Sequence, residues 1–306
     1  MDSAFEMFTP ALESDLKAKW TSSETPLLDD KQKKRYQALI GSLLYLMHAT
    51  RPDLAFSVIR LSQFASCPRL CHWEALKRVL RYLKGTASAS LMLGNSDAPP
   101  MDNLPGNDDP AQLIGYFDAA HNDNADNRST CGYLFTLFGS PISWTSKVQR
   151  TVALSTTEAE LMAGTEAARE AIWIRGLTDA LFGTLCCELR GDNQGSLALT
   201  TNPVYHQRTK HIALRHRFIC DLVNDGVISV KNVASRDMLA DSFTKPLPRD
   251  LHAHHCALIG LRLHRPDDAH VDKLGLTRKM KIRCDDCGNL FADEAALHKH
   301  KLKKEM

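Results

Sequence analysis

A change of hydrophobic pattern at a proline-rich stretch limits the folds open to this chain. Apolar residues recur at helical spacing over 31–94, whereas short β-prone runs follow residue 110. Between them, residues 95–110 hold four prolines and little that could be buried, which predicts a linker. The expected order after the linker is three strands, a helix, a strand, two helices, a strand and a helix. This order predicts an α/β fold, a mixed sheet with helices on its faces.

The expected sheet domain covers residues 111–262 and contains one long helix. That helix begins near Ser155, whose hydroxyl can cap it together with Glu158 or Glu160, and it continues to about Phe182. Strands are expected at 113–118, 132–138, 141–146, 185–190 and 227–233, with a hairpin turn at 139–140 and further helices from about 193, over 211–223 and near 235–237.

The segments outside the sheet domain differ in character. Residues 1–30 lack sustained periodicity and are expected to be loosely ordered, and 31–94 should be helical with a break at Pro52. Residues 263–306 form a basic tail. Composition excludes little else: the net charge of +2 permits a nucleic-acid partner only through a local basic patch.

Cysteine usage and apolar runs bear on the compartment. Nine cysteines without a regular framework favour a reducing environment. The longest apolar run, 38–47, has half the length that a bilayer requires, and the first twenty residues do not resemble a signal peptide. We therefore expect no membrane partner and a location in the cytoplasm or nucleus.

Four acids fall where sheet-based acid sites form. Asp118 ends the first strand, Glu160 lies in the first turns of the long helix, Asp192 follows the fourth strand, and Asp241 lies in the last helix. Gathered carboxylates repel one another, and two Mg²⁺ ions can cancel that repulsion while activating a water for phosphodiester hydrolysis. The pattern is consistent with a two-metal hydrolase.

The spacing of these acids is weak evidence by itself, because the chain has 36 acidic residues. A plainer alternative is that Asp118 and Asp192 cap turns, Glu160 caps a helix and Asp241 faces water, and spacing alone favours it. Helical geometry does favour Glu160 over Glu158 as the inward acid. Glu160 shares a face with small residues that permit close approach to a sheet, which leaves Glu158 as a capping or solvent-facing residue.

Several long motifs change that balance. The stretches "IGYFDAAHNDNADNRSTCGYLFTLFGSPISWTSKVQRTVALSTTEAELMAGTEAAREAIWIRGL", "GDNQGSLALTTNPVYHQRTKHIALRHRFICDLVNDGVISV" and "DMLADSFTKPL" resemble the ribonuclease H domain of copia-type long-terminal-repeat retrotransposons. Upstream, "YQALIGSLLYLMHATRPDLAFSVIRLSQFASCPRLCHWEALKRVLRYLKGT" resembles the segment that joins reverse transcriptase to that domain. The resemblance spans roughly 33–262.

The resemblance implies a ribonuclease H-like fold and a role for each acid. The implied fold is a five-stranded mixed sheet that begins with three antiparallel strands. Asp118, Glu160, Asp192 and Asp241 match the four metal-binding carboxylates, with Glu160 also orienting water. The implied cofactor is a pair of Mg²⁺ ions, or Mn²⁺ in their place. The implied substrate is an RNA–DNA hybrid, of which the RNA strand is cut.

Some family features are absent from this chain. Ala120 and His121 stand where the first motif usually continues Asp-Trp, and Ala213 stands at an often acidic position. Residues 233–240 lack the histidine of many ribonucleases H, which leaves His211 and His216 as weak candidates for a proton shuttle. No polymerase motif occurs, so the polymerase portion of a reverse transcriptase is an expected partner and not part of this chain.

Basic residues around 208–217 are the best candidates for phosphate contacts, because Lys and Arg bind the backbone without sequence choice. Trp144 and Trp173 could stack bases, but their strand and helix positions favour core packing. The candidate contact residues are Arg208, Lys210, Arg215 and Arg217.

The tail resembles a two-cysteine, two-histidine zinc finger. Cys284, Cys287 and His300 have the spacing of three Zn²⁺ ligands within 278–306. The fourth ligand would fall near Lys304, so the finger is incomplete or takes a ligand from elsewhere.

Two functions remain at this stage, and the oligomeric state is open. The first is a hybrid-cleaving ribonuclease H; the second is a catalytically silent nucleic-acid-binding remnant with a finger-like tail.

Overall fold

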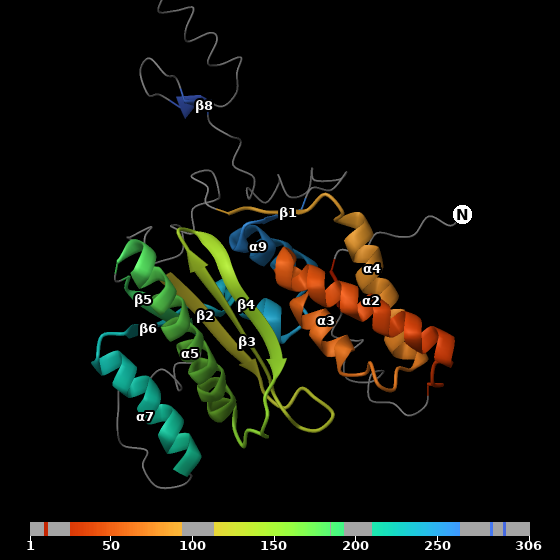
Figure 1. Ribbon diagram of the computed structural model, residues 1–306, viewed down its shortest axis with the longest axis horizontal. Helices are drawn as coiled ribbons and strands as arrows, with labels where there is room; N and C mark the ends of the chain where they lie inside the picture. Colours follow the sequence, from red (N-terminus) through yellow and green to blue (C-terminus); the bar gives the residue numbers. More distant parts are fainter. Residues whose placement is uncertain are drawn as a thin grey trace, which may run out of the picture.

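The computed structural model describes residues 9–11, 25–93, 113–183, 185–192 and 210–263, together with the backbone of 282–283 and 290–291. Its centre is a five-stranded sheet (Figure 1). The sheet strands are β2 (Leu113–Ala120), β3 (Thr130–Leu137), β4 (Ser140–Val148), β5 (Cys187–Gly191) and β6 (Ile228–Asn232).

The strand order is β4-β3-β2-β5-β6. β2 pairs antiparallel with β3, and β3 with β4, whereas β5 runs parallel to β2 and β6 parallel to β5. Each parallel neighbour is reached through a helical connection or a long segment, because parallel strands cannot be joined by a tight turn. The mixed sheet with three antiparallel strands first is the fold class predicted from the sequence, and it is confirmed.

The β3–β4 hairpin turns at Phe138 and Gly139, one residue earlier than expected. Phe138 has φ 51° and Gly139 has φ 71°. A two-residue turn with positive φ at both central positions follows the right-handed twist of the flanking strands. The twist of the sheet therefore decided the turn, and glycine accepts its conformation without strain.

One face of the sheet is covered by α5 (Thr156–Phe182) and α7 (Lys210–Asn224), as Figure 1 shows in green and teal. Leu113 and Phe117 of β2 point toward this face. The side of α5 that contacts them carries small residues, which allows the helix to lie close to the strands. The predicted inward face of α5 is confirmed, since its members Glu160, Ala163, Gly164, Ala167 and Ala171 are all buried.

The opposite face packs against the N-terminal helices and the end of the described chain. These elements are α2 (Asp30–Ala49), η1 (Pro52–Leu54), α3 (Ala55–Ser62), α4 (Leu70–Gly85), η3 (Ser235–Asp237), α8 (Asp241–Thr244) and α9 (Arg249–Ile259). A small sheet of β1 (Ser90–Leu91) and β7 (Leu261–Arg262) joins the two segments, and β8 (Ile282–Arg283) pairs with β9 (Leu290–Phe291).

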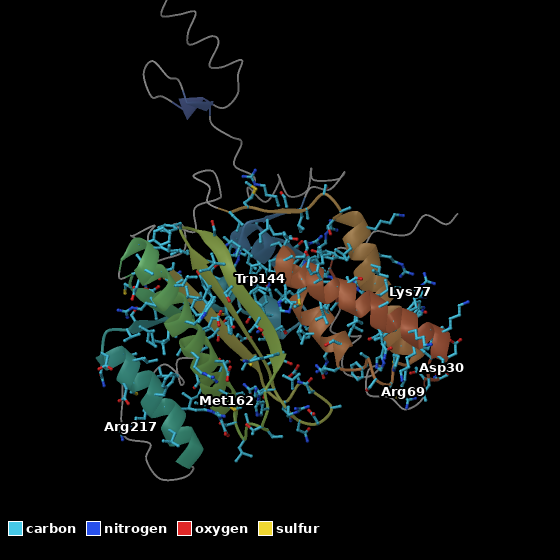
Figure 2. All side chains as sticks on the ribbon, viewed as in Figure 1. Asp30, Arg69, Lys77, Trp144, Met162 and Arg217 are labelled. Carbon is cyan, nitrogen blue, oxygen red and sulfur yellow. The ribbon has the colours of Figure 1, made fainter. Side chains whose placement is uncertain are left out.

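The N-terminal helices share one hydrophobic core with the sheet. Tyr36 and Leu61 belong to the same buried cluster as Tyr116 of β2 and Phe243 of α8. The indole of Trp144 on β4 donates to the Met47 carbonyl at the end of α2, at 3.0 Å (Figure 2). The helices therefore complete the core on this face of the sheet.

A buried polar network fixes the predicted break at Pro52. The Arg51 guanidinium donates to both carboxylate oxygens of Asp53, at 2.9 and 2.7 Å. The Tyr82 hydroxyl donates to Asp53 at 2.7 Å and lies 3.0 Å from the His252 ring. Because every member has a partner, the network can bridge η1, α4 and α9 without leaving a charge unpaired.

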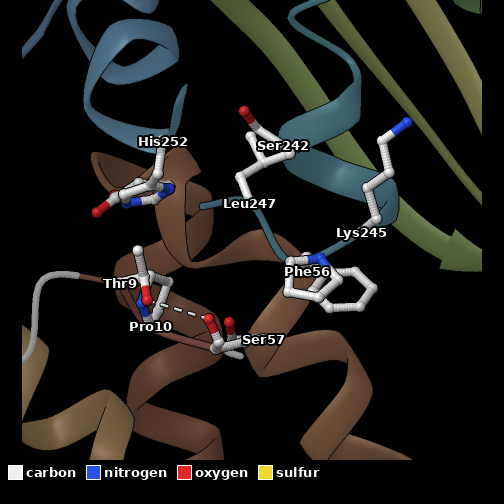
Figure 3. A pocket seen from close by; sticks show the side chains of 11 residues that line it. Thr9, Pro10, Phe56, Ser57, Ser242, Lys245, Leu247 and His252 are labelled. Atoms are coloured by element: carbon white, nitrogen blue, oxygen red, sulfur yellow. Dashed lines mark hydrogen bonds between the residues drawn. The ribbon is translucent and has the colours of Figure 1, made fainter. Parts of the chain in front are cut away.

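Residues 9–11 line a small pocket together with residues of α3 and of the α8–α9 segment. Figure 3 shows Thr9 and Pro10 beside Ser57, with Leu247 and His252 on the other side. Thr9 and Ala11 are buried there. A short piece of the 1–30 segment is thus held by the fold.

The structure overturns one expectation about a large apolar side chain. Trp173 is 63% exposed, so its predicted core position is wrong. The inward face of α5 passes through Ala171 and Ile174, which turns Trp173 outward. Among the described residues, no helix is both long and apolar enough to cross a membrane. The predicted linker at 95–110 and the helix from about 193 lie outside the described residues.

We expect Gly132→Ala to destabilise the protein by about 1–3 kcal/mol, because a Cβ there would lie 2.5 Å from the Cβ of Phe243. Gly176→Ala is the matched control: no atom lies within 4 Å of its added Cβ, and it should stabilise α5 by up to about 1 kcal/mol. Urea unfolding measures both values. Equal effects would contradict close packing of α8 on β3.

Candidate active site

Strand register brings Asp118 and Asp192 together. Tyr116 of β2 lies opposite Arg190 of β5 in the parallel pair, so two residues further along Asp118 lies level with Asp192. Side chains two apart in a strand share a face, and neighbouring strands lie about 4.8 Å apart. Both carboxylates therefore point to the face of the sheet that carries α8.

The start of α5 supplies the third acid. Ser155 caps the helix by accepting from the Glu158 amide at 3.1 Å, and the Glu158 carboxylate accepts from the Leu154 amide at 2.8 Å. Glu158 thus caps the helix as expected, although it is buried and does not face solvent. Glu160 instead lies beside Asp118, and the Ala119 amide donates a hydrogen bond to the Glu160 carboxylate.

Three of the four predicted acids form a compact cluster. Asp118, Glu160 and Asp192 each offer a carboxylate oxygen, and these oxygens lie within 4.8 Å of one another. Carboxylate oxygens this close together could share one hard divalent cation. The plainer alternative of scattered capping residues does not describe this arrangement.

Asp241, the fourth acid, lies beside the cluster but is not one of the three. It begins α8, which approaches β3 where Gly132 leaves no side chain in the way. Its Oδ2 accepts from the Lys245 ammonium at 2.9 Å. At the other end of α8, the Thr244 hydroxyl donates to Asp118. The short helix α8 therefore supplies Asp241 and also contacts the cluster through Thr244.

Burial and mutual repulsion shift two of these acids strongly. Burial, then the charges of Asp118 and Asp192, raises the pKa of Glu160 to about 9. Burial and the Asp118 charge raise the pKa of Asp241 to about 7, although Lys245 opposes this shift. Both shifts mean that negative charge here lacks sufficient compensation from the protein.

The donor set suits a hard divalent cation. Glu160 Oε2 and Asp241 Oδ1 are buried and have no hydrogen-bond partner among the described residues. Carboxylate oxygens are the ligands that Mg²⁺ prefers, and a cation would compensate the charge that raises both pKa values. The residues present therefore fit the ion that the sequence predicted.

Two retrotransposon proteins are similar in sequence to most of this chain. A retrovirus-related Pol polyprotein from transposon TNT 1-94 of Nicotiana tabacum is 41% identical over 222 residues, covering 70% of this chain. A second, from transposon RE2 of Arabidopsis thaliana, is 42% identical over 217 residues and also covers 70%. The chain is homologous to a part of these retrovirus-related Pol polyproteins. It spans 15% and 14% of the length of these two relatives.

The comparisons with family models and with solved structures are less informative. No protein-family model matches the chain. A solved ribonuclease H1, LC11-RNase H1 isolated from compost, superposes with a TM-score of 0.36 at 16% identity, covering 44% of this chain and 93% of that one. The strand order described above characterises the fold better than this weak superposition.

Only some of the basic residues predicted to contact nucleic acid lie among the described residues. Arg215 and Arg217 lie on α7, where Arg215 is half-buried and Arg217 is exposed and lies 3.6 Å from Asp221 (Figure 2). Arg208 and the Lys210 side chain lie outside the described residues. The predicted zinc ligands Cys284, Cys287 and His300 also lie outside them.

No predicted shuttle histidine is brought to the cluster among the described side chains. His216 lies 3.7 Å from Cys220 on α7, and the His211 side chain is not described. His255 lies near α8, but its ring contacts the Ser242 hydroxyl and the Arg236 carbonyl, at 2.9 and 3.0 Å. Burial lowers the pKa of His255 to about 4, as expected for a structural histidine.

Sequence reasoning missed Thr244 and Lys245. Both lie in the quoted motif "LADSFTKPL", three and four residues after Asp241. That spacing places Lys245 on the same side of one helical turn as Asp241, which was a usable signal. The Thr244 contact with Asp118 spans 126 residues and had no local signal.

We expect the metal-free protein to lose stability as the pH rises from about 4 to 9, with the Asp241 part of the loss complete near pH 7. Both carboxyls have raised pKa values, so above about pH 4 the unfolded chain releases protons that the fold still keeps, and the free energy of unfolding falls until each folded pKa is passed. Each carboxyl contributes at most about 1.4 kcal/mol per pH unit. Thermal melts in chelator measure this, and Mg²⁺ should raise the melting temperature more at pH 9 than at pH 6. A double variant, Glu160→Gln with Asp241→Asn, should flatten the pH dependence.

Proposed function

We propose that this chain is a ribonuclease H that hydrolyses the RNA strand of RNA–DNA hybrids. The observation that supports this most strongly is the convergence of Asp118, Glu160 and Asp192 from two strands and a helix. Carboxylates this close together, two of them buried, destabilise a fold unless they bind cations, so their proximity needs a functional reason. The family resemblance supplies the reaction class.

In the proposed site, Asp118, Glu160 and Asp192 would hold one Mg²⁺, and Asp241 with Asp118 would hold a second. Bound there, Mg²⁺ or Mn²⁺ would lower the pKa of a water and compensate charge on the phosphodiester. Glu160 orients the attacking water. The water oxygen bonds to phosphorus while the bond to the 3′ oxygen breaks, which gives a 3′-hydroxyl and a 5′-phosphate.

The chain's own residues keep these groups in place. Thr244 holds one oxygen of Asp118 through its hydroxyl. The Ala119 amide holds Glu160 near the cluster. Held in this way, the acids need little rearrangement when substrate arrives, and prior positioning lowers the barrier to reaction.

Substrate choice is proposed to rest on the 2′-hydroxyls of the RNA strand, which the DNA strand lacks. The exposed Arg217 on α7 is a candidate for backbone contacts, together with Arg208, Lys210 and Arg215. We propose residues 111–262 as the nuclease domain and 31–94 as the segment that contacts the polymerase portion of a longer polyprotein.

We expect the protein to cut a labelled RNA–DNA hybrid in Mg²⁺ and to leave the matching DNA duplex intact. Asp192→Asn should lower the rate by at least about 100-fold, since it removes a charged ligand from the cluster. Gel analysis of both proteins measures this, with Asp225→Asn as a surface control away from the cluster.

Equal product from the wild type and Asp192→Asn would end the enzyme assignment. Hybrid binding without cleavage by either protein would instead support the rival function, a silent nucleic-acid-binding remnant.

A further inference from the structure

Lys245 places a positive charge against the one predicted acid that stands outside the three-carboxylate cluster. Its ammonium lies 2.9 Å from Asp241 Oδ2, four residues away along the chain. Asp241 is buried, with 6% of its side chain exposed, whereas 44% of the Lys245 side chain is exposed. The lysine thus reaches from the surface into the edge of the site.

The path of the Lys245 side chain favours its contact with Asp241. Lys245 lines a pocket together with Thr9 and Pro10, and Figure 3 shows its ammonium pointing away from that pocket. Pro246 follows directly, which restricts the backbone at Lys245 to extended conformations. Lys245 has ψ 157°, which fits that restriction. The backbone therefore limits the directions that the ammonium can take.

This contact gives a partner to only one of the two carboxylate oxygens of Asp241. Its Oδ2 has the ammonium, while its buried Oδ1 has no hydrogen-bond partner among the described residues. Glu160 Oε2, across the cluster, is in the same state. The described ion pairs place no ammonium this close to the three-carboxylate cluster, although the Lys245 charge also acts on Asp118 and, more weakly, on Asp192. Among the described residues, a metal ion would therefore compete with a direct ammonium contact at Asp241 but not at the cluster.

We propose that Lys245 is a positioning residue: its ammonium occupies Asp241 in the metal-free protein and must yield that carboxylate to the second metal ion. This inference rests on the proposed two-metal function. The two ions then bind with unequal affinity, the cluster of Asp118, Glu160 and Asp192 first and the Asp241 side second. The lysine holds the acid in place until enough metal is present to displace it.

The test is titration of the full chain with Mn²⁺ in a calorimeter, without nucleic acid. In Lys245→Met we expect the second ion to bind about tenfold more tightly than in the wild type, since a charge-assisted hydrogen bond no longer competes. The first ion should tighten much less than the second, because Lys245 acts on Asp118 and Asp192 through its charge without a direct contact among the described ion pairs. Lys245→Arg keeps the positive charge and should behave as the wild type.

Lys231→Met is the matched control, because Lys231 has a similar exposure of 42% and its carboxylate neighbour, Glu188 at 3.9 Å, is outside the cluster. It should leave both affinities unchanged. Unchanged Mn²⁺ binding in Lys245→Met would overturn the proposal. Equal tightening of both ions would overturn it too, because that result indicates a general field and not competition for Asp241.

Hybrid cleavage, measured in parallel, separates this proposal from the function on which it rests. A wild type that does not cut, but whose second ion tightens in Lys245→Met, supports the role of Lys245 and removes the nuclease function. A wild type that cuts, with unchanged Mn²⁺ affinities in Lys245→Met, removes the role of Lys245 alone.

Discussion

Repulsion among buried carboxylates is the interaction to which the rest of the structure responds. Asp118 and Glu160 are buried and Asp192 is half-buried, and their carboxylates lie close together. Burial, then the charges of Asp118 and Asp192, raises the pKa of Glu160 to about 9. A fold keeps such a cluster only if the surrounding packing is strong enough to hold it. The shared core of sheet and N-terminal helices supplies that packing, since Tyr36 and Leu61 lie in one cluster with Tyr116.

The helix α8 connects this core to the site. Phe243 is fully buried against the sheet, while its neighbours Asp241 and Thr244 contact the charged groups. Gly132 allows the approach, because any side chain there would meet Phe243. A change in core packing would therefore move the acids directly. This coupling explains why a four-residue helix matters to the proposed chemistry.

The sequence and the family resemblance together led to much of the site. A short β-prone run predicted β2 and a capping signal predicted the start of α5, each within a few residues, and the parallel register then brings Asp118 level with Asp192. The small residues of α5 favoured Glu160 over its neighbour Glu158, and both carboxylates lie as that argument required. Trp173 was misplaced, because a large apolar residue on a helix gives no sign of which face is buried once small residues line the sheet.

By itself, then, the sequence determined the types and order of the elements, because periodicity and capping act over a few residues. Only the tertiary structure decided that α2 to α4 close the second face of the sheet, with the Trp144 indole bonded to the Met47 carbonyl 97 residues away. It also decided that Thr244 meets Asp118 and that Lys245 pairs with Asp241 beside the cluster. Such contacts depend on how whole faces pack against each other, and no local pattern records that.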